Sequence, residues 1–244
     1  MANTAPPGRA KLGISLVLLI AALSILVSLG TWQVRRLHWK EALIADIAAR
    51  QQMPPASLSE IEAAVAKGEA VEYRPVRAEG RYLNDKERHF FATFQGRTGY
   101  YVYTPLELAD GRYLFVNRGF VPYENKEPAT RADGLLQGPQ TVIGLARSRL
   151  SEKPSSMVPE NDIAKNIFYW KDLDRMAAST GLEADRVLPF FLDADAAPVP
   201  GGMPHGGVTQ IDLPNNHLQY AVTWYGLAAV LLVISAIAFF RRKA

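Results

Sequence analysis

The chain has 244 residues, no cysteine, and 27 basic against 24 acidic residues, which gives a formal net charge of +3 at pH 7. Without cysteine, a disulfide framework, thiolate catalysis and cysteine-ligated zinc or iron–sulfur centres are excluded. The small positive charge is not gathered into a basic patch with interleaved aromatic residues. Nucleic-acid binding is therefore not predicted.

Two long stretches without charge lie near the ends of the sequence, from Leu12 to Val34 and from Leu213 to Phe240. At about 1.5 Å per residue, a helix of either length crosses a hydrocarbon layer of about 30 Å. Both are predicted to be transmembrane helices. A cleaved signal peptide is the alternative for the first stretch, but its apolar core is long and no small-x-small cleavage site precedes Trp32.

The two tails indicate the orientation. They contain five basic and no acidic residues, namely Arg9, Lys11, Arg241, Arg242 and Lys243. Basic tails favour the cytoplasm, whereas the remaining 22 basic and 24 acidic residues give the rest of the chain a net charge of −2. The predicted order is a cytoplasmic tail (1–11), a transmembrane helix (12–34), a periplasmic α+β domain (35–212), a second transmembrane helix (213–240) and a cytoplasmic tail (241–244). So short an N-terminal tail leaves no room for an organelle presequence, which favours a bacterial inner membrane.

Helical spacing continues beyond the first span. Leu37, Leu43, Ile44 and Ile47 recur at intervals typical of one helix face, up to the Met53-Pro54-Pro55 stop. One long helix is therefore expected to leave the membrane. A Ser57–Glu60 capping box predicts a short helix that ends near Gly68, and another helix is predicted from Asp172 to Gly181.

The rest of the middle region has strand character. Six runs rich in Val, Tyr, Phe and Ile are predicted strands: Tyr73–Leu83, His89–Phe94, Tyr100–Leu106, Arg112–Asn117, Thr141–Ser148 and Val187–Leu192. Asp110-Gly111 predicts a hairpin between the third and fourth runs. Because the strands do not alternate with helices, the expected core is an antiparallel sheet that closes toward a barrel, with a few short helices.

The middle region shows no recognisable catalytic motif. The histidines His38, His89, His205 and His217 lack metal-ligand spacing, and no nucleophile elbow or phosphate-binding glycine loop is present. His89 and His205 are interpreted as ordinary core or surface residues. The chain is not predicted to be an enzyme.

His217 is the main candidate because of its place in the sequence. The 21 residues from Tyr220 to Phe240 form about 31 Å of helix, which puts the imidazole at the outer edge of the membrane. Positions 217, 221, 224, 228 and 235 share one face, where small residues let a helix or a flat ligand come close. Two interpretations remain open: helix packing with an interfacial histidine, or ligation of haem iron by a neutral imidazole.

A second cluster lies at the outer end of the first span. Trp32, Arg35, Arg36 and Trp39 are spaced i, i+3, i+4 and i+7, so they share a helix face. Such residues commonly anchor a helix at the membrane surface. Two guanidinium groups at the depth of His217 also suit the two propionates of a haem, with Trp32 or Trp224 stacked on the ring.

At these residues the chain resembles the surfeit locus protein 1 family. Segment 29–40, LGTWQVRRLHWK, is similar to the family's "LGxWQxxRxxWK" opening. The similarity continues in segments 104–106, 110–111, 116–122 and 168–170, with Phe120 where the family usually has Trp, and it closes in segment 216–228, NHLQYAVTWYGLA. The match thus runs from the first span to the second.

The resemblance implies a two-span assembly factor of haem-copper cytochrome c oxidase, whose external domain assists maturation of subunit I. Bacterial relatives are associated with haem a, and the family's second-span histidine matches His217. The expectation is a haem chaperone in which His217 ligates the iron, Arg35 and Arg36 neutralise propionates, and Trp32, Tyr220 and Trp224 wall the pocket. The alternative is a cofactor-free membrane scaffold that stabilises subunit I or the haem a synthase. Arg118 is expected either to pair with a buried carboxylate or to touch a partner.

Overall fold

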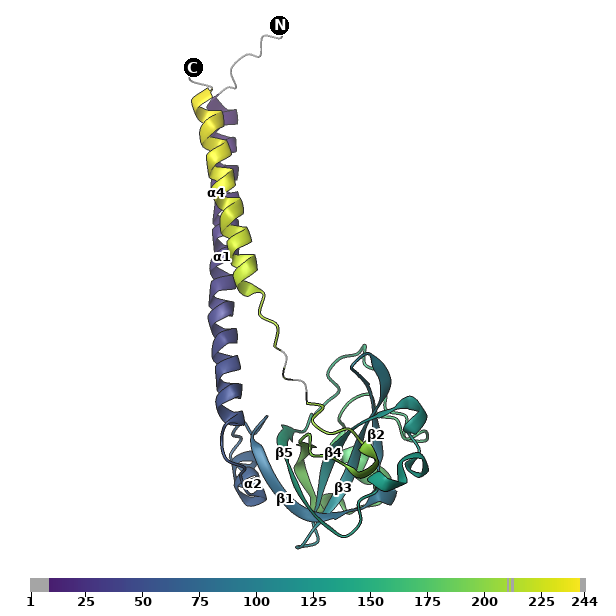
Figure 1. Cartoon of the computed structure of the whole chain (residues 1–244). Helices are drawn as coiled ribbons and strands as arrows, with labels where there is room; N and C mark the ends of the chain where they lie inside the picture. The colour runs from purple at the N-terminus through teal and green to yellow at the C-terminus, as the bar shows by residue number, and fades with distance from the viewer. Residues whose placement is uncertain (1–8, 210, 212, 242–244) are drawn as a thin grey trace. The chain divides into compact units, whose positions relative to one another are not determined.

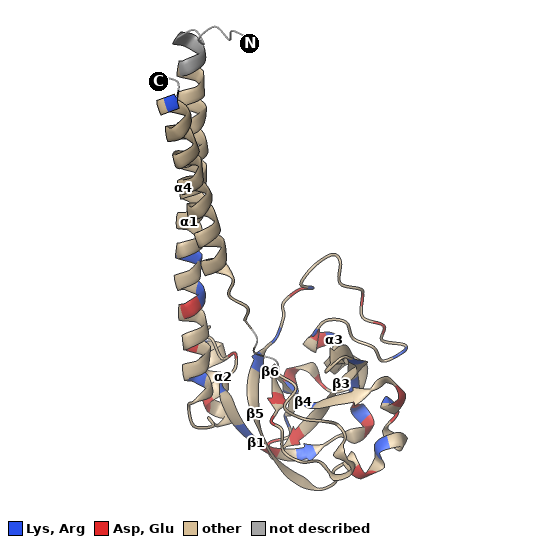
Figure 2. Ribbon diagram, turned by 45° about the horizontal axis from the view of Figure 1, so that its top comes forward, with Lys and Arg blue, Asp and Glu red and all other residues tan. Residues whose placement is uncertain are grey.

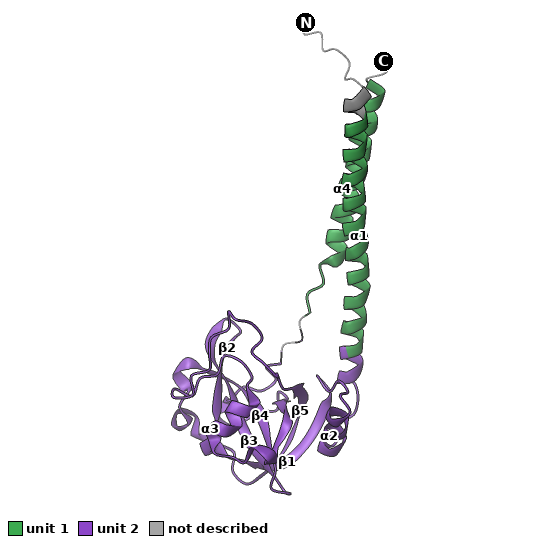
Figure 3. Cartoon of the chain, turned by 180° about the vertical axis from the view of Figure 1, so that it is seen from behind, with its two compact units in different colours: residues 1–46, 212–244 green, residues 47–211 purple. Residues whose placement is uncertain are grey.

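The structure, a computed structural model of the whole chain, describes residues 9–209, 211 and 213–241, and gives residues 9–12 by their backbone only. The chain divides into two compact units, residues 1–46 with 212–244 and residues 47–211 (Figures 1 and 3). Most of the N-terminal tail, together with Arg242 and Lys243, lies outside the described residues. Each unit is described by itself below.

The first unit is a pair of antiparallel helices, drawn side by side in Figures 1 and 3. Helix α1 spans Arg9–Gln51 and helix α4 spans His217–Arg241, and both are long and apolar enough to cross a membrane. The predicted continuation of the first span as one long helix is confirmed. Helix α4 begins later than the charge-free stretch, and the Asn216 carbonyl accepts the first turn's bond from Tyr220 at 3.2 Å.

The two helices meet along a seam of small and apolar side chains. On α4 the seam residues are His217, Ala221, Trp224, Ala228, Leu231 and Ser235, all buried or half-buried. Their spacing alternates between four and three residues, as in coiled-coil packing. The opposing α1 residues are Leu19, Ala22, Leu23, Leu26, Leu29, Gly30, Gln33 and Leu37. The large apolar side chains outside the seam are exposed, and Figure 2 shows a long stretch of both helices without charge, which suits contact with lipid.

One glycine of the seam lets the helices approach closely. A Cβ atom on Gly30 would lie 2.8 Å from the Tyr225 ring. The Tyr225 hydroxyl oxygen is 3.0 Å from the Thr31 hydroxyl oxygen. The Thr31 hydroxyl itself donates a hydrogen bond to the Val27 carbonyl at 2.8 Å. Tyr225 is therefore the donor, and its ring and hydroxyl together fix how α4 lies against α1.

The second unit is built on a closed β-barrel. All six predicted strands are present: β1 Pro75–Tyr82, β2 Arg88–Phe94, β3 Arg97–Leu108, β4 Tyr113–Pro122, β5 Pro139–Ser148 and β6 Val187–Ala194. Their order is β1-β5-β6-β4-β3-β2, and a further β1–β3 pairing closes the first five strands into a ring. At this closure a Cβ on Gly80 would lie 2.3 Å from the Glu107 carbonyl oxygen, so only glycine fits.

The expected antiparallel, barrel-like core is present, with one pair of strands that departs from it. Strands β4 and β6 run parallel, whereas the other neighbours are antiparallel. A parallel pair requires a long crossover, and here β5 and the segment up to β6 supply it. The predicted hairpin at Asp110-Gly111 joins β3 to β4 and is confirmed.

Two short helices accompany the barrel at the predicted places. Helix α2 spans Leu58–Ala66 and carries the Ser57–Glu60 capping box, and helix α3 spans Leu173–Thr180 between an Asp172 N-cap and Gly181 at its C-terminal end. Short 3₁₀ turns occupy Asn84–Lys86, Tyr123–Asn125, Pro128–Gly134, Ala184–Arg186 and Pro200–Gly202. The main core lies inside the barrel with α2 against it, while α3 covers a second, aromatic cluster that includes Tyr103, Phe115, Phe168 and Phe191.

Candidate functional site

The helix pair brings His217 onto a polar partner from the other helix. His217 Nδ1 lies 2.7 Å from Gln33 Oε1, and Gln33 is buried in the seam. An amide oxygen only accepts hydrogen bonds, so Nδ1 carries a proton, and in the neutral form of the imidazole Nε2 then keeps its lone pair. No hydrogen bond to Nε2 is found within residues 9–209, 211 and 213–241. A neutral imidazole held in this way has the donor atom that haem iron takes.

The other predicted residues gather on one flank of the helix pair. Successive helix residues are rotated by about 100°. On α1, this rotation carries Gly30 and Thr31 to one side of Gln33, and Trp32 and Arg36 to the other. The Tyr225 contact with Gly30 and Thr31 shows which sides of the two helices coincide.

On α4, the same rotation puts Tyr220 and Trp224 on the side of His217 away from Tyr225. They therefore lie on the same flank of the pair as Trp32 and Arg36. We call this the Trp32 flank, made of Trp32, Arg36, Tyr220 and Trp224.

Three side chains of the Trp32 flank, those of Trp32, Arg36 and Tyr220, are open to the surroundings, whereas Trp224 lies at the edge of the seam. Trp32 and Tyr220 are each about half exposed, and Trp224 is half-buried. Arg36 stacks on Trp39, with its guanidinium carbon 3.7 Å from the ring centroid, and Arg35 is exposed further round the helix. An open aromatic flank beside a free imidazole nitrogen fits a flat, amphiphilic ring with anionic groups.

Gln33 was not among the residues that the sequence predicted for this site. Its position in the segment LGTWQVRR is one signal, because a buried amide in a charge-free span needs a hydrogen-bond partner. Which of several polar groups on the other helix it meets depends on the register of the two helices. That register is fixed by side-chain packing and not by periodicity.

The barrel unit contains a second candidate, a buried polar cluster. Arg131 donates to both carboxylate oxygens of Glu87, and Arg118 Nη1 lies 3.8 Å from the same carboxylate. Arg118 also donates to Asn84 Oδ1 at 3.1 Å and to the Gly134 carbonyl. Of the two roles expected for Arg118, pairing with a buried carboxylate is the one that the structure shows.

His89 lies in the same cluster. Its Nδ1 is 3.1 Å from the Asn166 side-chain nitrogen, and only 4% of its surface is exposed. Burial, with the nearby cations of Arg131 and Lys126, lowers the pKa of His89 to about 3. His89 is therefore a neutral core residue, as interpreted from the sequence, whereas His205 is exposed and pairs with Phe120 through its backbone.

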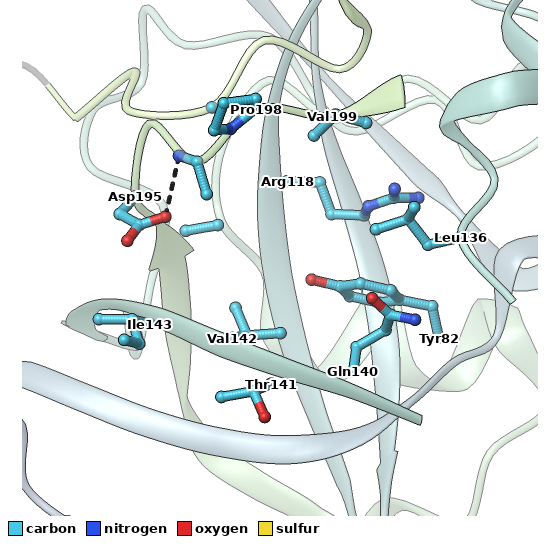
Figure 4. Close-up of a pocket in the computed structure, with 13 residues that line it drawn as sticks. Tyr82, Arg118, Leu136, Gln140, Thr141, Val142, Ile143, Asp195, Pro198 and Val199 are labelled. Carbon is cyan, nitrogen blue, oxygen red and sulfur yellow. Dashed lines mark hydrogen bonds between the residues drawn. The ribbon is translucent and has the colours of Figure 1, made fainter. Parts of the chain in front are cut away.

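A shallow pocket opens beside this cluster (Figure 4). Its volume is about 200 Å³, below the usual range of about 300–1,000 Å³ for small-molecule sites. The Arg118 guanidinium lies on its wall, 4.5 Å from the Tyr82 ring. It donates hydrogen bonds to Asn84 Oδ1 and to the Gly134 carbonyl. Within the described part of the chain, no group of three or more His, Asp or Glu side chains is placed to hold a metal ion. The helix pair is thus the stronger candidate site.

These features define a class of protein: a β-barrel domain between two terminal helices that are apolar enough to span a membrane, with a histidine–glutamine pair where the helices meet. The sequence model of the SURF1 family matches residues 20–229. The chain therefore belongs to the SURF1 family.

Proteins called "Surfeit locus protein 1" are among its relatives. The one from Homo sapiens is 39% identical over 219 residues, covering 82% of this chain and 69% of the human one. The protein from Rattus norvegicus is 38% identical over 217 residues, covering 82% and 68% of the two chains. That from Takifugu rubripes is 37% identical over 219 residues, covering 82% and 87%.

Proposed function

We propose that this protein is an assembly factor for haem-copper cytochrome c oxidase, which binds haem a and assists its insertion into subunit I. This proposal is supported mainly by His217, whose Nδ1 lies 2.7 Å from Gln33 Oε1. This bond leaves Nε2 of the neutral imidazole as the ligand atom for the iron. Haem a would supply an iron centre in an amphiphilic ring with two propionates. The chain supplies binding and orientation, and its role is not catalytic.

The proposed binding residues are His217, Arg35, Arg36, Trp32, Tyr220 and Trp224. His217 is the axial ligand of the iron, and the arginines neutralise the propionates. Trp32, Tyr220 and Trp224 wall the ring on the Trp32 flank. Arg36 lies closer than Arg35 to the seam, because it is rotated by only about 60° from Gln33. Arg36 is therefore the stronger candidate for a propionate.

The proposed location is a bacterial inner membrane, with the barrel domain in the periplasm and both tails in the cytoplasm. The basic tails and the net negative middle region support this orientation. The proposed partner is subunit I of cytochrome c oxidase, and the haem a synthase is a second candidate partner.

The test is an optical and pyridine-haemochrome spectrum of detergent-purified protein from cells that make haem a. The wild-type protein should show a Soret band that His217→Ala lacks. His38→Ala is the matched control, since His38 is an exposed histidine on the partner helix and should leave the spectrum unchanged. A colourless wild-type protein, or an unchanged spectrum of His217→Ala, would remove the haem assignment.

The alternative is a cofactor-free membrane scaffold, and the seam itself favours it. Ala221 and Ala228 are the buried residues of α4, so this face serves helix packing whether or not a cofactor is present. For a scaffold, His217→Ala should leave oxidase assembly intact, while large residues at both alanines should abolish it. Loss of assembly in His217→Ala without loss of helix pairing would favour the haem chaperone.

A further inference from the structure

The hydrogen bond between the helices assigns a role to a residue beyond the ligand itself. Gln33 and His217 come from opposite ends of the sequence, yet Gln33 Oε1 and His217 Nδ1 lie 2.7 Å apart. Gln33 is 9% exposed, so water does not compete freely for its amide. A free neutral imidazole exchanges its proton between two nitrogens, and a fixed acceptor at Nδ1 selects one of the two tautomers.

The packing around Gln33 keeps this acceptor in place. About one turn along α1, Tyr225 contacts Gly30 and bonds to Thr31 on the opposite flank. This second contact fixes the register of α4 against α1 independently of Gln33. The Gln33 amide therefore does not have to hold the helices together, and its oxygen is presented to His217 by the seam.

The chemistry of the acceptor also matters. Histidine ligands of metals usually donate their second N–H to a carboxylate or a carbonyl, and a negative acceptor makes the imidazole a stronger donor. Here the acceptor is a neutral amide in a span without charge. A neutral acceptor orients the ring without strengthening the ligand to the same degree, which suits a protein that must release its cargo.

We propose, on the basis of the proposed function, that Gln33 is the positioning residue of the haem a site. It holds His217 in the Nδ1–H tautomer, and so presents Nε2 to the iron, with a neutral acceptor that keeps binding reversible.

The first measurement needs no haem. In full-length protein with ¹⁵N-labelled histidine, in detergent at pH 8, the ring nitrogens of His217 are assigned by their loss in His217→Ala. Wild type should show Nδ1 protonated and Nε2 unprotonated. Gln33→Leu should show a mixture of tautomers, whereas Gln33→Glu, which keeps an acceptor oxygen, should retain the Nδ1–H form.

The second measurement is the dissociation constant for added haem a. Gln33→Leu should weaken binding by about 10- to 100-fold, the usual effect of removing such a partner. Gln33→Glu should bind more tightly than Gln33→Leu. Tyr225→Phe is the matched control, because it deletes the hydroxyl bond to Thr31 but keeps the ring that packs on Gly30, and it should change neither the tautomer nor the affinity.

The outcomes separate this inference from the proposed function. If His217→Ala binds haem a like wild type, the haem assignment fails whatever Gln33 does. If His217→Ala loses haem a while Gln33→Leu keeps the Nδ1–H tautomer and wild-type affinity, only the role of Gln33 is overturned. Loss of the Nδ1–H form in Gln33→Glu would overturn it as well.

Discussion

The hydrogen-bond partner of Nδ1 distinguishes His217, in the helix pair, from His89, in the barrel unit. Gln33 accepts the Nδ1 proton of His217, whereas Asn166 donates to Nδ1 of His89 while the cations of Arg131 and Lys126 stand nearby. In the neutral form of His217, the first environment leaves a lone pair available at Nε2. The second keeps the imidazole neutral inside the barrel unit, where a positive charge is disfavoured.

His89 should make the folded protein sensitive to acid. Its pKa is lowered from 6.5 to about 3, so below pH 6.5 the unfolded chain binds a proton that the folded chain does not. The stabilisation is therefore complete above pH 6.5 and is lost as the pH falls toward 3. Between pH 7 and pH 5 the loss is on the order of 2 kcal/mol.

Chemical denaturation of full-length His89→Gln at pH 7 and pH 5 tests this. Its free energy of unfolding should fall less than that of wild type by about this amount. His205→Gln replaces an exposed histidine and should follow wild type. Equal pH dependence in wild type and His89→Gln would contradict a neutral buried His89.

At the scale of residues, sequence patterns could predict His217 but not its partner. His217 is conspicuous because it precedes an apolar span. Gln33 becomes informative only when the α1–α4 register is known. Likewise, the sequence left two roles open for Arg118, since the Glu87 carboxylate that it faces comes from the turn before another strand.

The helices and strands themselves were easier to predict from the sequence than the way they pair with one another. Six strands, the Ser57–Glu60 capping box and the long first helix follow from local patterns, and all are present. The parallel β4–β6 pair was missed because strand direction depends on the route of the crossover, which alternation of side chains does not encode. The start of α4 at His217 was also missed, because a count of uncharged residues does not locate the first turn of a helix.

The seam between α1 and α4 gives a matched pair of substitutions. At Gly30 a side chain meets the Tyr225 ring, whereas at Gly226 an added Cβ meets nothing within 4 Å. Gly30→Leu should destabilise the helix pair by about 1–3 kcal/mol through overpacking. Gly226→Leu should be neutral or slightly stabilising, since leucine favours a helix more than glycine does.

Tryptophan fluorescence can follow this change selectively. Of the four tryptophans, only Trp170 belongs to the barrel unit, so in a Trp170→Phe background Trp32, Trp39 and Trp224 report on the helix pair. Denaturation by SDS should then begin at a lower SDS fraction for Gly30→Leu than for Gly226→Leu. The reverse order would contradict the close packing of Gly30 against the Tyr225 ring.

For the molecule as a whole, the natural absence of cysteine makes orientation testable. A single introduced cysteine is the only thiol in the chain. With the basic tails inside, Ser155→Cys in the barrel unit should react with a membrane-impermeant maleimide in cells whose outer membrane is permeabilised. Ala244→Cys should react only after the inner membrane is disrupted. Labelling of Ala244→Cys alone in such cells would show the opposite orientation.

Ring closure has a consequence for how this domain meets other chains. Five strands have no open edge, and β2, the sixth, has its outer edge engaged where Phe168 exchanges backbone hydrogen bonds with His89 and Phe91, both at 2.8 Å. Exposed edges invite strand addition and aggregation. With these backbone groups paired within the domain, a newly made copy offers few free strand edges to a neighbouring copy.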